Sequence, residues 1–472
     1  MVEFILNNKT IKTELPAGST VLDFIRYHKR LMGTKIGCRE GDCGACTILV
    51  GDIEKEKLVY RSMTSCLMPL TNAAGKHIVT VEGINQYKLS PVQQAMVDTN
   101  GTQCGFCTIG FVMSLTGFVL SENEKHYNEA IASIDGNICR CTGYKSIERA
   151  AQILSEKIKD KPNDETIEWL VLYGFIPAYF NSIKERLIDL KKSFVVNDEF
   201  KNDALLIGGG TDLIVQKHSL VKKSVIKNLF DATQLKGISQ QDGKCIMGAS
   251  VTVTEFAESL LIQKYFPDLQ KHIKLLSSTP IRNMATLAGN LVNASPIGDM
   301  TVFLLALNSS LVLNIKGNKR TLQLKDFYKG YKQLDKSPVE IIEQIIFTPP
   351  EKNAVFNFEK VCKRTHLDIA SVNCACQLQM NEDDAINEIH IAAGGVAPFP
   401  KYLFNTVQFL QGKKITQQVL EQAIEIMNNE TAPISDARGT KEYKQLLLRQ
   451  LFLAHFIKFS GEADFIKNIL AA

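Results

Sequence analysis

The sequence lacks the features of a membrane, secreted or nucleic-acid-binding protein. No apolar run approaches the ~20 residues that a membrane-spanning helix needs. The opening residues, MVEFILNNKTIK, hold no signal-peptide-like apolar stretch, because Ile5 and Leu6 are followed at once by Asn7 and Asn8. The net charge is only +4 over 472 residues, without a basic block. We therefore expect a cytoplasmic protein that neither enters a membrane nor binds nucleic acid.

The sequence also lacks a recognisable catalytic set and a disulfide framework. Its eight histidines are scattered, and His28 and His366 are interpreted as structural or solvated residues. No Ser–His–Asp set or carboxylate pair stands out, so no catalytic residue is assigned. Twelve cysteines are too few for a disulfide scaffold of this length. Eight of them fall at ligand-like spacings, which favours a reducing compartment.

What the sequence does contain is a cysteine-rich loop at residues 33–47, GTKIGCREGDCGACT. Cys38, Cys43 and Cys46 form a C-x4-C-x2-C array, with Cys66 downstream, which is the plant-type ferredoxin spacing for a [2Fe–2S] cluster. The loop's glycines permit positive φ and bring backbone N–H groups close to sulfur. These glycines are Gly33, Gly37, Gly41 and Gly44. A structural zinc loop is the alternative, although zinc favours paired short spacings.

A second set of four cysteines follows as C-x2-C and C-x-C pairs. Cys104 and Cys107 are separated from Cys139 and Cys141 by 31 residues. Each pair precedes a predicted apolar helix, whose positive N-terminal end favours anionic thiolates. On spacing alone zinc is an alternative here. The neighbouring ferredoxin-type motif favours iron, since two clusters make an electron relay.

The first 160 residues are predicted to form a small mixed sheet packed on one helix, followed by a helical region. The predicted strands are residues 2–6, 11–15, 47–50, 57–61 and 77–82. The predicted helices include one from the Ser19 and Thr20 N-cap to His28, one from Ser90 and Pro91, and those at 109–120 and 147–158. The charged stretch 157–166 is interpreted as a linker.

Two glycine-rich stretches in the middle of the chain are candidate ligand loops. Residues 204–215, ALLIGGGTDLIV, predict a buried strand that runs into a turn where N–H groups can approach a pyrophosphate. This is not the G-x-G-x-x-G fingerprint, and a plain tight turn is the alternative. Residues 279–299, TPIRNMATLAGNLVNASPIGD, could wrap a polar ligand or form an ordinary surface loop.

The last third is predicted to be another α+β region. Strands are expected at 355–360, 371–380 and 388–393, and helices at 416–428 and 441–459. The remaining cysteines are interpreted as buried apolar residues rather than ligands. They are Cys245, Cys362, Cys374 and Cys376.

Together these motifs resemble the molybdenum hydroxylases, a family that includes xanthine dehydrogenase and aldehyde oxidase. GTKIGCREGDCGACT, QCGFCTIGFVMS and GNICRCTGYKSI are similar to the family's iron–sulfur half. IGGGTD, RNMATLAGN, SPIGD, GGVAP and PISDARGTKEY are similar to its flavin half. The resemblance implies an α+β multidomain fold. The implied parts are a β-grasp ferredoxin-like domain (1–86), a four-helix [2Fe–2S] domain (87–158), a linker (159–168), an α+β FAD-binding domain (169–350) and a C-terminal α+β flavoprotein domain (351–472).

By position, the resemblance implies that the eight clustered cysteines ligate two [2Fe–2S] clusters and that Gln103 contacts a partner's pterin. The implied FAD contacts are Leu206, Ile207, Gly208, Gly209, Gly210, Thr211, Asp212, Leu213, Leu276, Thr286, Gly289, Asn290, Asp299, Ile342 and Lys360. Two positions depart from the family. Ile109 replaces a proline, and Leu276 stands where animal members carry an aromatic residue.

The order of motifs, with no molybdenum domain following, resembles the small subunit of the two-subunit xanthine dehydrogenases of bacteria. That resemblance implies a large molybdopterin-binding partner, a heterotetramer of two small and two large subunits, and electron flow through two clusters to FAD and then NAD. The implied substrates are hypoxanthine and xanthine, oxidised to urate. The alternatives are an aldehyde or another N-heterocycle, a partnerless flavin and iron–sulfur carrier or redox sensor, and a zinc-stabilised binding protein.

Overall fold

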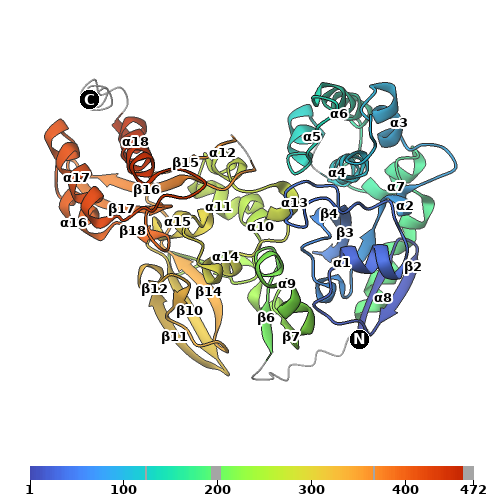
Figure 1. Cartoon of the computed structure of the whole chain (residues 1–472), viewed down its shortest axis with the longest axis horizontal. Helices are drawn as coiled ribbons and strands as arrows, with labels where there is room; N and C mark the ends of the chain where they lie inside the picture. The colour runs from blue at the N-terminus through green and yellow to red at the C-terminus, as the bar shows by residue number, and fades with distance from the viewer. Residues whose placement is uncertain (123–124, 193–203, 365–366, 461–472) are drawn as a thin grey trace. The chain divides into compact units, whose positions relative to one another are not determined.

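The chain forms two compact units (Figure 1). Unit 1 comprises Met1–Phe230 and Ser278–Ala285, and unit 2 comprises Asp231–Ser277 and Thr286–Ala472. The computed structural model describes residues 1–122, 125–192, 204–364 and 367–460, so His366 lies outside the described residues. The five domain ranges expected from the sequence stay predictions. None of the described helices combines the length and the apolar character that a bilayer-crossing segment requires.

Unit 1 begins with a five-stranded mixed sheet of order β2-β1-β5-β3-β4, in which only β1 and β5 pair in parallel. Fully buried Phe4, Ile48 and Ile78 share one core with Leu22 and Ile25 of the covering helical turn. This is the β-grasp arrangement expected from the sequence. Its elements are β1 (Val2–Leu6), β2 (Lys9–Thr13), α1 (Val21–Asp23), η1 (Phe24–His28), β3 (Thr47–Glu54), β4 (Lys57–Thr64), η2 (Leu70–Ala73), β5 (His77–Val79) and α2 (Val81–Ile84).

Two local expectations for this sheet were wrong. The second strand starts at Lys9 because Asn7, at φ 51°, lets the chain reverse over a two-residue turn. The predicted 77–82 strand ends at Val79 and gives way to helix α2. The covering helical segment begins at the Thr20 N-cap, as predicted, but it is not a regular α-helix, since η1 is π-helical and the Lys29 N–H donates to the Phe24 carbonyl at 3.0 Å.

The helical part of unit 1 contains four helices around one apolar core, as expected. They are α3 (Pro91–Asp98), α4 (Thr108–Leu120), α5 (Tyr127–Ser133) and α6 (Lys145–Lys157). Ser90 begins α3 with a reciprocal capping box to Gln93. The charged stretch after α6 is anchored, because Lys161 is 1% exposed and its ammonium group donates to the Val119 carbonyl at 2.9 Å. That ammonium satisfies a carbonyl in the last turn of α4.

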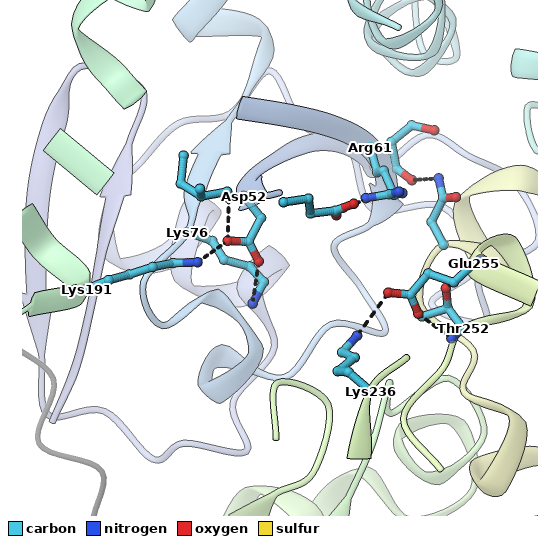
Figure 2. Close-up of polar contacts among 11 residues, drawn as sticks. Asp52, Arg61, Lys76, Lys191, Lys236, Thr252 and Glu255 are labelled. Atoms are coloured by element: carbon cyan, nitrogen blue, oxygen red, sulfur yellow. Dashed lines mark hydrogen bonds and ion pairs between the residues drawn. The ribbon is translucent and has the colours of Figure 1, made fainter. Parts of the chain in front are cut away.

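The rest of unit 1 packs against these parts. It consists of α7 (Thr166–Leu172), η3 (Ala178–Ser182), α8 (Ile183–Lys192), β6 (Leu205–Ile207), α9 (Leu213–Lys223), β7 (Ile226–Asn228) and α13 (Thr279–Arg282). Helix α8 is held on the ferredoxin-like sheet by an apolar cluster and by Asp52, whose carboxylate lies between Lys76 and Lys191 (Figure 2). Although burial opposes it, the two lysines lower the pKa of Asp52.

Unit 2 contains a five-stranded antiparallel sheet of order β11-β10-β14-β9-β8. Thr252 and Glu255 form a capping box at α10, and Lys236 pairs with Glu255 at 3.4 Å (Figure 2). The elements are η4 (Thr233–Leu235), β8 (Ile238–Gln241), β9 (Lys244–Gly248), α10 (Val253–Glu258), α11 (Leu260–Tyr265), α12 (Leu269–Lys274), α14 (Leu287–Asn293), α15 (Asp299–Leu305), β10 (Ser310–Ile315), β11 (Asn318–Gln323), η5 (Leu324–Asp326), β12 (Tyr328–Gly330), β13 (Gln333–Leu334) and β14 (Ile341–Phe347).

A four-stranded antiparallel sheet, of order β15-β16-β17-β18, ends unit 2 and is covered by helices (Figure 1). Its elements are β15 (Ala354–Val361), β16 (Val372–Met380), β17 (Ile386–Gly394), β18 (Lys401–Tyr402), α16 (Phe404–Leu410), α17 (Gln417–Glu430) and α18 (Lys441–Ser460). Cys245, Cys374 and Cys376 are fully buried, as predicted. Cys362 is only half-buried, because β15 has ended there and its thiol donates to the Arg364 carbonyl at 2.6 Å.

Candidate cofactor sites

The four cysteines of the first predicted set form two thiol pairs. The Cys43 thiol donates to the Cys38 sulfur and lowers the pKa of Cys38 to about 5. The backbone N–H groups of Glu40 and Asp42 also donate to that sulfur, each at 3.3 Å. Cys46 and Cys66 make the second pair, in which the Cys66 thiol lowers the pKa of Cys46 and its own pKa is raised. One sulfur of each pair is therefore stabilised as the thiolate that a metal requires.

The glycines of this loop act in two different ways. Gly41 and Gly44 adopt φ values of 78° and 67°, as expected for a loop that wraps a ligand. Gly33 and Gly37 do not have positive φ, contrary to the expectation for the whole set. They provide space instead, because a Cβ atom on Gly37 would lie 2.5 Å from the Cys43 sulfur. Glycine at position 37 therefore lets the backbone of the loop approach the Cys43 sulfur closely.

The second set also forms two pairs, and it is more exposed. The sulfurs of Cys104 and Cys141 lie 3.6 Å apart, and both residues are exposed. Cys107, the N-cap residue of α4, pairs with buried Cys139. Burial raises the pKa of Cys107 to about 12. Burial also opposes ionisation of Cys139, but the hydroxyl and N–H of Thr142 donate to its sulfur, and the net effect lowers the pKa of Cys139.

The two cysteine loops contact each other directly. The backbone N–H of Ile138 donates to the Cys43 carbonyl oxygen at 3.1 Å. The neighbouring Asn137 is buried, and its amide donates to the Gly44 carbonyl at 3.2 Å while it accepts from the Ser114 hydroxyl at 2.7 Å. The backbone of one loop is thus joined to that of the other beside two predicted ligands.

The donor chemistry at both sets fits a [2Fe–2S] cluster. Such a cluster takes four thiolates, and each iron needs two of them in addition to the bridging sulfides. Two thiol pairs per set, with backbone N–H donors on the sulfurs, match that requirement. Within the described ranges, no three Cys, His, Asp or Glu side chains form a group suited to a single metal ion.

The predicted FAD residues fall in both units. Leu206–Leu213 belong to unit 1, where β6 ends at Ile207 and the glycine turn leads into α9. Gly209 packs so closely that a Cβ atom there would lie 1.8 Å from the Met284 carbonyl oxygen. Gly210 has φ 83°, and the Gly208 carbonyl accepts from the Asn72 amide at 2.9 Å. The turn is therefore fixed by close backbone contacts that a side chain would prevent.

The other predicted FAD residues lie in unit 2, and several of them interact. The Asn290 side-chain oxygen accepts from the N–H and hydroxyl of Thr301 at 3.1 and 2.9 Å. The side chain of Lys360 is 1% exposed and pairs with Asp299 at 2.8 Å. Thr286 is the N-cap of α14 and accepts from the N–H of Gly289 at 3.2 Å. Leu276 and Ile342 are buried, at 3% exposure each.

Sequence reasoning missed several residues that hold these sites. Asn373 donates to Asp299 and to the Ile297 carbonyl, which ties strand β16 to the SPIGD motif. Asp135, four residues before Cys139, accepts from Arg282 at 2.8 Å. A single asparagine or aspartate in a strand or loop gives no periodic signal. For the contact of Asn373 with the SPIGD motif, the sequence offers one related signal, the neighbouring GGVAP motif. Its Gly395 N–H donates to the Pro296 carbonyl at 2.8 Å.

Four protein-family descriptions match this chain in the order of its parts. They are "2Fe-2S iron-sulfur cluster binding domain" at residues 4–71, "[2Fe-2S] binding domain" at 80–152, "FAD binding domain in molybdopterin dehydrogenase" at 182–350 and "CO dehydrogenase flavoprotein C-terminal domain" at 358–459. The chain belongs to the molybdenum hydroxylase family. The expected fold and the two kinds of cofactor domain, [2Fe–2S] and FAD, are thereby confirmed.

Similar proteins include two xanthine dehydrogenases. The xanthine dehydrogenase of Emericella nidulans is 30% identical over 483 residues, covering 88% of this chain and 35% of its own length. That of Blastobotrys adeninivorans is 29% identical, with coverage of 97% and 41%. The chain thus spans well under half the length of these relatives. Among solved structures, reconstituted CO dehydrogenase from Oligotropha carboxidovorans matches at 25% identity and a TM-score of 0.50, covering 53% of this chain and 87% of that one.

Proposed function

We propose that this chain is the electron-transfer subunit of a two-subunit molybdenum hydroxylase. Bound [2Fe–2S] clusters and FAD would supply the one-electron and two-electron steps. The observation that carries the proposal is the hydrogen bond from Ile138 to Cys43, because it joins the two predicted cluster loops next to their ligands. A relay needs such closeness, whereas two independent zinc sites do not.

The chain's own part is to bind and tune these groups. The eight cysteines supply the thiolates in four pairs, and the N–H groups of Glu40, Asp42 and Thr142 donate to their sulfurs. Donors on sulfur stabilise the more negative, reduced state of a cluster. The residues with predicted FAD roles would hold the flavin, and the glycine turn would offer N–H groups to the pyrophosphate.

A large molybdopterin-binding subunit is the proposed partner, in a heterotetramer of two small and two large subunits. The second cysteine set supports a docking role, because it lies among exposed residues. Gln103, Cys104 and Cys141 are exposed, and Phe106 and Ile138 are 46% and 37% exposed despite being apolar. Exposed apolar groups around a redox site favour contact with another protein. Gln103 would contact the partner's pterin.

Xanthine and hypoxanthine are the proposed substrates of the complex, with NAD as the final acceptor. The xanthine dehydrogenases among the similar proteins support this choice. The purine would be hydroxylated in the partner, so another N-heterocycle or an aldehyde is the second candidate. The likeness to a CO dehydrogenase among the solved structures supports only that proteins of this fold serve complexes with different substrates. Either substrate leaves the relay of this chain unchanged.

The experiment is an affinity purification of the tagged chain from its native host under anaerobic conditions. Co-purification of a larger molybdenum-containing subunit, together with xanthine-dependent NAD reduction, is the expected result. A complex that does not oxidise xanthine but oxidises an aldehyde or another heterocycle would overturn the purine proposal in favour of the second candidate. Iron and flavin without any partner would overturn the subunit proposal in favour of a free-standing carrier or sensor.

A further inference from the structure

Eight residues from the middle of the sequence lie with the iron–sulfur part of the molecule. The segment Ser278–Ala285 belongs to unit 1, although the chain on both sides of it belongs to unit 2. It contains the short helix α13, and its polar side chains Arg282 and Asn283 are 8% and 5% exposed. Burying an arginine is costly unless its partners compensate, so the contacts of this segment need an explanation.

The first contact fixes the loop that carries the second cysteine set. One oxygen of the Asp135 carboxylate accepts from the Thr279 N–H at 2.8 Å, and the other accepts from Arg282 at 2.8 Å. Arg282 also donates to the Thr279 hydroxyl at 2.7 Å. Next to Asp135, a Cβ atom on Gly136 would lie only 3.0 Å from Pro280. Asp135 is held from two sides, and Cys139 follows four residues later.

The second contact fixes the first cysteine loop and the strand beside it. A Cβ atom on Gly41, between Cys38 and Cys43, would lie 2.6 Å from the Ile281 side chain. The Asn283 amide donates to the Ser62 carbonyl on β4 at 2.8 Å, four residues before Cys66. The same eight residues therefore touch both cysteine loops.

We propose that Arg282 and Asp135 are positioning residues for electron transfer between the two clusters. Their ion pair holds residues 135–141 in the register that lets Ile138 donate to Cys43. In the step concerned one electron leaves one cluster and enters the other, so the first is oxidised, the second is reduced and no bond forms or breaks. The proposal rests on the proposed cluster ligands. The rate of electron transfer falls steeply with the distance between the clusters. An ion pair that fixes the position of one cysteine loop therefore affects this rate as well as the stability of the fold.

The test uses the full chain with its co-purifying partner and the variant Arg282→Gln. Arg320→Gln is the matched control, because Arg320 pairs with Glu340 at the same 2.8 Å but lies in unit 2. The readouts are iron content, the mutual splitting of the EPR signals of the two reduced clusters, and the rate of electron redistribution after a light-driven reductive pulse. We expect R282Q to keep its iron, to show altered splitting and to redistribute electrons several-fold more slowly, because a change in the separation of the two clusters changes the rate of electron transfer between them. R320Q should match the wild type.

Two further variants keep the proposal testable if R282Q fails to fold. Asp135→Asn retains an acceptor for Thr279 but loses the charge, and it should show the same slowing. Arg282→Lys should restore part of the rate, since it retains the charge without the planar guanidinium group. Unchanged splitting and rate in iron-replete R282Q or D135N, even with a lower Tm, would overturn the positioning role. A wild-type protein without cluster signals would instead overturn the proposed function.

Discussion

Ile138 donates its backbone N–H to the carbonyl oxygen of Cys43 at 3.1 Å. Ile138 adjoins Cys139 in sequence. The hydrogen bond therefore links Cys43, a predicted ligand of one cluster, to the residue next to Cys139, a predicted ligand of the other. Cys43 and Cys139 are 96 residues apart in the sequence. The contact between their loops is a product of the fold, and it makes the pair of loops a single functional unit.

Asn137 should be important for this contact. Asn137 is buried, and Asn137→Ala removes its hydrogen bonds with the Gly44 carbonyl and the Ser114 hydroxyl. Unsatisfied buried polar groups cost about 1–3 kcal/mol each, so the thermal midpoint should fall. The inter-cluster EPR splitting should change as well. Asn181→Ala, at an exposed site, is the control, and equal midpoints for the two variants would contradict the argument.

The two cysteine sets should lose their metal independently. Cys43→Ser should remove about two of four iron atoms per chain and abolish one EPR signal, because a [2Fe–2S] cluster needs all four thiolates. The EPR signal of the other cluster should remain, but without the splitting that the first cluster causes. Cys374→Ser changes a fully buried cysteine on β16 and should keep all the iron. Iron loss in C374S to the same extent would show that the assay reports folding and not ligation.

The glycine turn should not accept a side chain. Gly209→Ala places a Cβ atom 1.8 Å from the Met284 carbonyl, and backbone cannot yield as a flexible side chain can. We expect a loss of bound flavin and a destabilisation of about 1–3 kcal/mol, as for other overpacked sites. Gly243→Ala, in a turn where nothing lies within 4 Å, introduces strain only through its φ of 75° and should keep its flavin. Absorbance at flavin wavelengths after gel filtration measures the difference, and full flavin content in G209A would refute it.

Much of this architecture could be predicted, because its local signals are strong. The cysteine spacings, the Ser90–Gln93 capping box and the long apolar helix α4 each depend on neighbours within a few residues. The π-helical turn Phe24–His28 could not be predicted, since its energy depends on tertiary packing. The same holds for Lys161, which has the composition of a linker residue but is buried.

The candidate sites divide in the same way. Motifs identified the cysteines and the glycine turn, which carry their chemistry in sequence order. Asp135, Arg282 and Asn373 remained hidden because their roles exist only when distant segments meet. Of the two reasons for which Gly37 was identified, the close approach that a side chain would obstruct is confirmed, whereas the positive φ is not found.

Acid should destabilise unit 1 partly through His77. Its ring is fully buried, accepts from Tyr60 at 2.6 Å and donates to the Asn7 carbonyl at 2.8 Å, and burial lowers the pKa of His77 to about 3. The unfolded chain, with a histidine pKa of about 6.5, therefore binds more protons between pH 6.5 and 3.

His77 should thus lower the free energy of unfolding as pH falls through that window, by up to about 1.4 kcal/mol per pH unit. Urea midpoints between pH 4 and 7 measure this slope. His77→Gln should be less stable at pH 7 but show a shallower decline toward pH 4. His28→Gln, at an exposed site, is the control. A slope in H77Q equal to that of the wild type would contradict the assignment.

The most direct test of the account is the metal and flavin content of the chain purified anaerobically. We predict about four iron and four sulfide per chain, from two [2Fe–2S] clusters, together with one FAD and two distinguishable EPR signals on reduction. Zinc in place of iron at either cysteine set, or a colourless protein without flavin, would contradict the relay.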